Sequence, residues 1–212
     1  NGIEIANGAS ATVGGTASGA GNIVAGNAQY EVHVATNGNT IQGNYLDTNA
    51  NGDDLGSSSN ALRLTGDNNQ VGGTTASASN VIGHTATSAV SVNGTGNTLQ
   101  GNYIGVMPDG TAIGHASTGI RVYGAGHTIG GIGAGEANTI ANAGWGIGVG
   151  AGSGHTIRGN SIYNQAQQGI DFDRDGVTPN DAGDSDTGAN RLQNFPGIQN
   201  ASYDSGAEEV TV

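Results

Sequence analysis

The sequence predicts an all-β fold, a parallel β-helix (β-solenoid) of about seven turns with three short strands per turn. An octapeptide recurs every 58 residues, as NTIQGNYL at 39–46, NTLQGNYI at 97–104 and HTIRGNSI at 155–162. Apolar residues alternate strictly in short runs, which is typical of strands. Glycine accounts for 41 of the 212 residues and suits a chain with frequent corners. Repeats of this length indicate a solenoid.

The 58-residue repeat corresponds to two turns, and each turn contains three apolar pieces. The first piece alternates, as in Val32/Val34 and Leu62/Leu64, so both side chains lie on one face of a strand. The second piece has one central apolar residue, such as Ile41, and the third opens with Asn. A turn takes 27–30 residues, and at about 4.8 Å per turn the rod is roughly 34 Å long. Stability must come from stacking, because one turn cannot bury its own apolar face.

Long loops leave alternate turns, over 47–59 and 105–118, which explains why the full period spans two turns. We expect the β-helix to occupy residues 1–196, with an Asp-rich closing segment at 171–196. Residues 197–212 are expected to form a linker and the first strand of a following domain. The chain begins without Met, and both ends fall inside recognisable patterns. We therefore expect it to be a segment of a longer protein.

Charge and composition exclude several classes of partner. The net charge is −12, and the five basic residues are all Arg. So few cations cannot form a basic patch, and we expect no nucleic-acid partner. We also expect no membrane insertion, because no apolar run approaches the roughly 20 residues of a membrane span. Cys is absent, so disulfides do not hold the fold, and the scarcity of Lys and Arg suits an extracellular or cell-surface location.

Asn recurs at one corner of six successive turns. Asn tolerates the left-handed backbone region, and its amide can bond to the amide of the next turn. We interpret this column as a structural ladder rather than a ligand site. Its predicted members are Asn22, Asn44, Asn80, Asn102, Asn138 and Asn160.

The outward face of the first strand is the candidate functional surface, with Glu4, His33, Arg63 and Arg121 on it. A polysaccharide lyase needs acids that hold Ca²⁺ and a base that accepts a proton, but no acidic cluster accompanies these arginines. A glycoside hydrolase needs two carboxylates about 5–10 Å apart, a spacing that Glu4 and Glu31 could approach. We favour a solvated polar stripe and assign no catalytic residue, and either enzyme remains the alternative.

The outward face of the second strand offers a further alternative. A flat threonine array would suit an ice-binding surface, but Gln70 interrupts the column, and β-branched residues are common in any strand. The five His have no metal-ligand spacing, and His127 and His155 replace Asn at a corner. The threonines concerned are Thr12, Thr40, Thr98, Thr128 and Thr156.

The strongest chemical signal is the Asp-rich run that begins at Asp171. It opens as D-x-D-x-D-G, the start of a Ca²⁺ loop, although position twelve is Ala182 rather than Glu. So many close carboxylates repel one another unless a cation neutralises them. We therefore predict bound Ca²⁺, and a solvated acidic cap is the alternative. The predicted ligands are Asp171, Asp173, Asp175, Asp181, Asp184 and Asp186.

NTLQGNYI, GIRVYGAGHTIGG and GEANTIA resemble right-handed parallel β-helix repeat proteins of bacteria, which by fold belong to the pectate-lyase-like superfamily. The stretch from GIDF to NRLQNFP is similar to the closing segment of such repeats in large secreted or surface-attached proteins. The resemblance covers residues 1 to about 200, and it implies a right-handed coil, secretion and a multidomain parent. The superfamily includes enzymes and inert stalks, so the resemblance identifies the fold more closely than the function.

We expect a structural or adhesive extracellular segment: a stalk, spacer or filament subunit. Its expected partners are carbohydrate or other copies of the chain stacked end to end, because an open β-helix end exposes unpaired strand edges. A polysaccharide lyase or glycoside hydrolase is the first alternative, and an ice-binding solenoid is the second.

Overall fold

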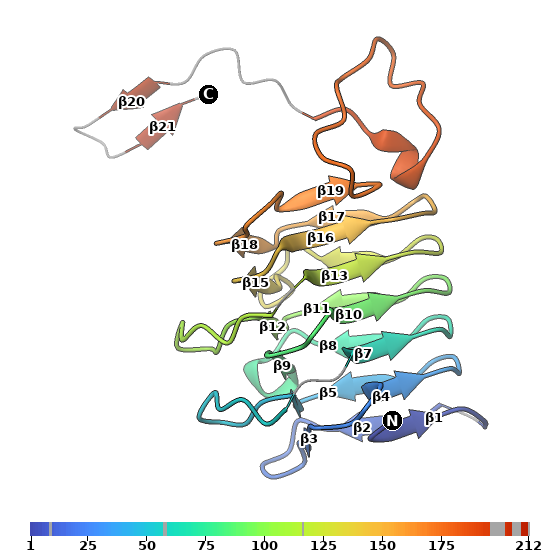
Figure 1. Cartoon of the computed structure of the whole chain (residues 1–212), viewed down its shortest axis with the longest axis vertical. Helices are drawn as coiled ribbons and strands as arrows, with labels where there is room; N and C mark the ends of the chain where they lie inside the picture. Colours follow the sequence, from blue (N-terminus) through green and yellow to red (C-terminus); the bar gives the residue numbers. More distant parts are fainter. Residues whose placement is uncertain (9, 57–58, 116, 196–201, 205–208, 212) are drawn as a thin grey trace.

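The computed structural model describes residues 1–8, 10–56, 59–115 and 117–195, together with the backbone of 202–204 and 209–211. These residues form a parallel β-solenoid of six complete turns and the first strand of a seventh (Figure 1). The predicted fold class is therefore confirmed. No helix in the described residues is both long and apolar enough to cross a membrane.

Three parallel sheets run along the solenoid, and each turn contributes one strand to each sheet. Sheet A contains β1 (Ile3–Ile5), β4 (Tyr30–Val34), β7 (Asn60–Leu64), β10 (Ser88–Val92), β13 (Thr118–Val122), β16 (Trp145–Val149) and β19 (Ile170–Phe172). Sheet B contains β2 (Thr12–Gly14), β5 (Thr40–Gln42), β8 (Gln70–Gly72), β11 (Thr98–Gln100), β14 (Thr128–Gly130) and β17 (Thr156–Arg158). Sheet C contains β3 (Ile23–Val24), β6 (Tyr45–Leu46), β9 (Val81–Ile82), β12 (Tyr103–Ile104), β15 (Thr139–Ala141) and β18 (Ser161–Tyr163).

Equivalent residues of successive turns lie directly above one another. Val32 pairs with Leu62, and Val34 pairs with Leu64. These side chains point into the solenoid and are fully buried, as is Ile41 of sheet B. Each inward side chain thus packs on its counterparts in the turns above and below, so the core is one continuous column.

The two long loops, which follow β6 and β12, leave the solenoid on the same side (Figure 1). Met107 and Ile113 of the second loop pack with Val81 of β9 in a small second core. Gly52, in the first of these loops, lies so close that an added Cβ would be 3.2 Å from Ile113 and 3.4 Å from Met107. The loops are therefore packed against the rod.

Residues 173–195, which we call the cap, lie on the C-terminal end of the stack (Figure 1). The cap contains the short 3₁₀ turn η2 (Ala189–Leu192), and Ala189 is buried in the solenoid core. The other 3₁₀ turn, η1, covers Ala76–Ala78. After the cap, β20 (Ser202–Asp204) and β21 (Glu209–Thr211) pair antiparallel, unlike the solenoid strands. A linker and a following domain remain a prediction, because 196–201, 205–208 and 212 lie outside the described residues.

Candidate functional site

The strand register places the predicted surface residues in one column on the outward face of sheet A. Glu4 pairs with His33, and His33 with Arg63. Ser91 lies next to Arg63 and is followed by Arg121. Alternation along each strand directs these side chains away from the core. The column continues over Gly148 and Asp171.

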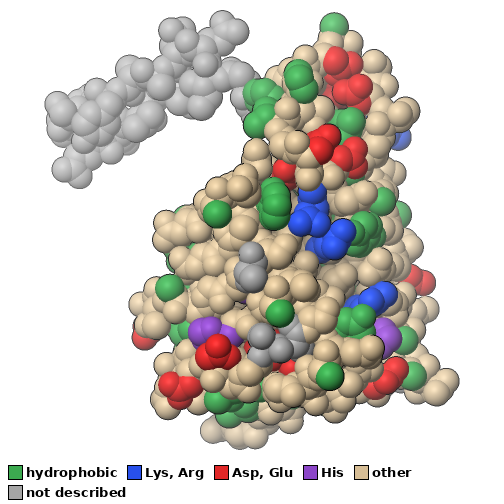
Figure 2. Space-filling view, viewed as in Figure 1, with side chains coloured by type: hydrophobic (Ala, Val, Ile, Leu, Met, Phe, Trp, Pro, Cys, Tyr) green, Lys and Arg blue, Asp and Glu red, His purple; other side chains and the backbone are tan. Residues whose placement is uncertain are grey.

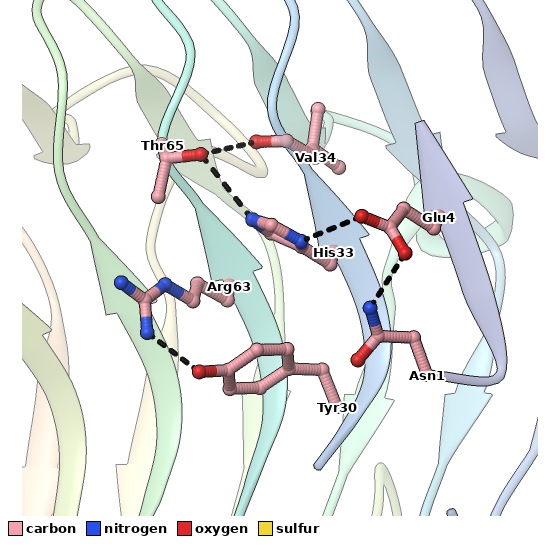
Figure 3. Close-up of polar contacts among 7 residues, drawn as sticks. All are labelled: Asn1, Glu4, Tyr30, His33, Val34, Arg63 and Thr65. Carbon is pink, nitrogen blue, oxygen red and sulfur yellow. Dashed lines mark hydrogen bonds and ion pairs between the residues drawn. The ribbon is translucent and has the colours of Figure 1, made fainter. Parts of the chain in front are cut away.

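The first half of the column is a hydrogen-bonded polar network (Figure 3). His33 Nδ1 lies 3.5 Å from a carboxylate oxygen of Glu4, and His33 Nε2 lies 3.3 Å from the Thr65 hydroxyl. Arg63 donates from Nη1 to the Tyr30 hydroxyl at 2.6 Å, and its guanidinium lies over the Tyr30 ring, 5.2 Å from the centroid. The ring therefore holds the Arg63 guanidinium in a fixed position.

Two further arginines form the same kind of stack in the upper half of the face. The Arg121 guanidinium lies 5.1 Å from the centroid of the Tyr123 ring. Arg174 reaches back from the cap, and its guanidinium lies 4.9 Å from the centroid of the Trp145 ring. Gly148 makes room for it, because an added Cβ there would be only 2.7 Å from Arg174 Cδ.

The burial of Arg174 and its closeness to Arg121 affect the pKa of Arg174. Burial lowers the pKa of Arg174, and the positive charge of Arg121 lowers it further. The two guanidinium groups are therefore close enough to repel each other. An arginine stays cationic at neutral pH even so.

Positive charge is concentrated on this face. Arg63, Arg121 and Arg174 are three of the five basic residues in a chain of net charge −12. In the described part of the chain, the one ion pair found is His33–Glu4, so no carboxylate there lies within 4.0 Å of these guanidinium groups. Figure 2 shows blue side chains gathered over the sheet A strands, below the red side chains of the cap. The face offers three arginines held against aromatic rings, and the carboxylate of Asp171 acts on Arg174 from beyond ion-pair distance.

The carboxylate pair considered for a glycoside hydrolase is not present on this face. Glu31 is fully buried, and its carboxylate accepts hydrogen bonds from the backbone N–H of Asn27 at 3.0 Å and from the Asn27 side-chain amide. Glu31 and Val32 are neighbours and are both buried, so burial does not alternate strictly at this point of β4. Glu31 is therefore buried and hydrogen-bonded rather than exposed on this face with Glu4.

Two hollows of the described residues can be compared with the position of this face. One, of about 630 Å³, lies between the last turn and the cap, beside Ile157 and Phe172. The other, of about 320 Å³, lies beside residues 15–21. Arg63, Arg121 and Arg174 line neither hollow, so the arginine face is not part of either one.

The six aspartates of the predicted calcium site do not converge. Asp171 is buried in β19, and one carboxylate oxygen accepts from the Gly176 N–H at 3.3 Å. Burial raises the pKa of its carboxyl group. Asp181 accepts from Ser185, whereas Asp184 accepts from the Asn194 N–H. In the described residues no group of three or more His, Cys, Asp or Glu is placed to hold a metal ion. Calcium binding therefore remains a prediction.

The six predicted ladder asparagines bond to one another in sequence along the corner between sheets B and C. Asn44 is typical: its Nδ2 donates to Asn80 Oδ1 at 3.0 Å, and its own Oδ1 accepts from Asn22 Nδ2 at 2.9 Å. Asn80 donates in the same way to Asn102. Asn102 bonds to Asn138, which in turn bonds to Asn160.

A second ladder at the corner between sheets A and B was not predicted as a ladder. Here each side chain accepts the backbone N–H of the turn before it. The sequence signal was the recognised replacement of Asn by His127 and His155, but the member contributed by the cap has no counterpart in the repeat. The members are Asn39, Asn69, Asn97, His127, His155 and Asn190.

The remaining histidines are separate from both ladders. His84 Nε2 lies 3.0 Å from the Gly52 carbonyl oxygen and ties the first long loop to the rod. His115 is buried beside Gly105, and burial lowers its pKa to about 4. The contacts of His84 and His115 are therefore structural.

The threonine column lies on sheet B as expected. Thr12 pairs with Thr40, but Gln70 separates Thr40 from Thr98. The column continues through Thr128 and Thr156. The array is therefore interrupted at its third position.

Comparisons with protein-family models, with curated proteins and with solved structures found no match to this chain. The fold itself defines the class, and the chain is a parallel β-solenoid.

Proposed function

We propose that this chain is a structural and adhesive segment of an extracellular protein, whose sheet A face binds anionic carbohydrate. In this role it acts as a stalk, spacer or filament subunit. One observation carries the proposal: three arginines stand on one face, each held against an aromatic ring, with no carboxylate of the described residues as an ion-pair partner.

The chemistry of arginine supports an anionic ligand. Its planar guanidinium presents a fixed set of N–H donors that matches carboxylate or sulfate oxygens. Stacking on Tyr30, Tyr123 and Trp145 orders these groups before a ligand arrives, which reduces the entropy lost on binding. Arg63 and Arg121 stand two turns apart, a rise of about 10 Å. A polymer with repeated negative charges can therefore contact several turns at once.

The scaffold role rests on the continuity of the rod. The core column and the two polar ladders run through successive turns without a break in register. A rod built in this way resists bending between turns, since each bend would separate paired backbones. End-to-end stacking of copies belongs to the same proposal, and electron microscopy of purified protein distinguishes monomers from filaments.

The enzyme alternative has weaker support. A lyase would place grouped acids beside Arg63 or Arg121, whereas each of these arginines lies two turns from a single carboxylate of the column. For Arg63 this is Glu4, which bonds to His33, and for Arg121 it is the buried Asp171. A hydrolase would need a second carboxylate, and Glu31 is bonded elsewhere. Product release from acidic polysaccharides that is abolished by Arg121→Ala would overturn the structural role.

Affinity electrophoresis through gels that contain polygalacturonate, dextran sulfate or neutral dextran tests the proposal. We expect retardation by a polyanion and none by neutral dextran. Arg63→Gln with Arg121→Gln should weaken binding by about tenfold or more, since each charged hydrogen bond contributes about 1.5–3 kcal/mol. Arg158→Gln is the matched control, because Arg158 belongs to sheet B. Equal retardation of the double variant and the wild type would contradict the proposal.

A further inference from the structure

His127 reproduces two of the hydrogen bonds that asparagine makes at this corner in the preceding turn. Asn97 accepts the Asn69 N–H at 2.8 Å and donates from its amide to the Asn93 carbonyl, four residues earlier. His127 Nδ1 accepts the Asn97 N–H at 3.1 Å, and its Nε2 lies 2.7 Å from the Tyr123 carbonyl, also four residues earlier. This pattern requires the neutral ring with its proton on Nε2.

His155 repeats the arrangement one turn later and connects to the cap. Its Nδ1 accepts the His127 N–H at 3.3 Å, and its Nε2 lies 3.3 Å from the Ala151 carbonyl. The two rings are stacked with their centroids 5.1 Å apart. The His155 N–H donates to Asn190 Oδ1 at 3.0 Å, so Asn190 of the cap ends the ladder.

Three sets of contacts between the cap and the rod bear on the ladder and its readout. Asn190 accepts the His155 N–H and donates its own N–H to the Gly152 carbonyl at 2.6 Å. Ala189 is buried in the core, and Arg174 stacks on Trp145. The first set depends directly on the position of the His155 backbone, which the two imidazole rings hold.

We propose that acidification loosens the cap by protonating His127 and His155. A proton on Nδ1 removes the acceptor for the backbone N–H of the preceding turn. Two such events break two successive bonds of the ladder and place two positive charges in one ring stack. The backbone of His155 is then no longer held where it meets Asn190, and the cap contact weakens.

The surroundings of the two imidazole rings determine the direction in which their pKa values are shifted. Burial lowers the pKa of His127, and the charge of His155 lowers it further, against opposing effects of the Tyr123 carbonyl and of Asp67. Burial also lowers the pKa of His155, against the effect of the Ala151 carbonyl. On the cap, the charged residue next to Asn190 is Arg191, which is exposed.

A histidine whose folded-state pKa lies below its unfolded value of about 6.5 favours the folded state when neutral. The contribution of such a histidine to the free energy of unfolding is complete above about pH 6.5. It decreases as the pH falls from there toward the folded-state pKa. The inference concerns the attachment of the cap to the rod and does not depend on the proposed carbohydrate contact.

The experiment follows the cap between pH 7.5 and 4.5. Trp145 is the only tryptophan of the chain, so its fluorescence reports the loss of the Arg174 stack. Hydrogen exchange, corrected for the rate in unstructured peptides, reports the His155 and Asn190 amides. Below about pH 6.5 we expect their protection to fall by about tenfold per pH unit for each proton taken up on opening. The backbone amides of β7 and β10 should keep their protection over the same pH range.

His127→Asn with His155→Asn restores the side chain that Asn39, Asn69 and Asn97 supply at this corner. This variant should keep the cap closed and remove the transition in the same range. His33→Asn is the matched control and should leave the transition unchanged. The same transition in the double variant, or none in the wild type, would overturn the inference.

Nuclear magnetic resonance of the wild-type imidazoles covers the case in which the double variant fails to fold. At neutral pH both rings should have unprotonated Nδ1 and protonated Nε2. Titration of the rings without a change in the exchange of the Asn190 amide would also overturn the inference.

Discussion

The repeated turns and the cap are built by different rules. In the turns, each inward residue stacks on its equivalents, and each ladder amide bonds to the next. In the cap, the backbone departs from ordinary conformations: among the described residues it holds six of the eleven non-glycine residues with positive φ. They are Asp173, Arg174, Asp184, Asn190, Arg191 and Leu192. Most residue types adopt this region only at a cost.

This difference between the turns and the cap indicates which of the two is more stable. A residue of the turns is stabilised by neighbours above and below, so its loss disturbs three turns. The cap has no repeat to stack on and depends on a few side chains at its base, above all Ala189, Asn190 and Arg174. We therefore expect the cap to open at a lower free energy than the turns.

The largest effect should come from breaking a ladder in the middle. Asn102 is buried and accepts from Asn80, while its amide donates to carbonyls and to Asn138. Asn102→Ala leaves several buried groups unpaired and should cost about 3–5 kcal/mol of unfolding free energy. Asn22→Ala, at the exposed end of the same ladder, should cost less than about 1 kcal/mol. Urea denaturation measures both, and similar costs would contradict the role of stacking.

The next effect should be confined to the cap. Ala189 is 1% exposed in the core, so Ala189→Asp places a charge there and should weaken attachment of the cap by about 2–3 kcal/mol. Hydrogen exchange should accelerate in the cap while β10 and β13 stay protected. Ala189→Ser is the milder control. Faster exchange throughout the turns would mean that the cap and the rod unfold as one unit.

A smaller effect is expected where the cap meets the arginine face. In Gly148→Ala the new methyl group would overlap Arg174 and displace it from Trp145. The lost stack is worth about 0.5–1 kcal/mol. Arg174→Gln removes the stack without changing the strand, so both variants should shift the tryptophan emission in the same direction. A shift in only one of them would show that the Trp145 environment does not depend on the stack.

The sequence predicted the turns far better than the cap or the face. Alternation at Val32 and Val34 and the recurring Asn44 position could be counted from copy to copy, because neighbours in space are equivalent residues of successive turns. Arg174 could not be placed in this way, since it folds back from a segment that has no copy. The burial of Glu31 could not be predicted from alternation either, because Glu31 and Val32 are neighbours and are both buried.

The aromatic partners were missed for a similar reason. Tyr30 and Trp145 stand at the first position of their strands, outside the alternating pair used to define the outward face. Their pairing with arginine crosses from one turn to another, as in Tyr30 with Arg63, or from the rod to the cap. Such contacts depend on how far a side chain extends, and this cannot be predicted from the alternation of residues along a strand.

The smallest effect is expected from calcium. Asp181 and Asp184 already bond within the cap, and the buried Asp171 accepts from the Gly176 N–H, so an ion would have to rearrange existing contacts. We predict weak binding, with a gain in stability of about 0.4 kcal/mol when free Ca²⁺ equals its dissociation constant. Calorimetric titration of metal-stripped protein measures it, and Asp181→Asn with Asp184→Asn should reduce the heat. No heat at millimolar Ca²⁺, with an unchanged melting temperature, would leave the cap stabilised by its protein contacts alone.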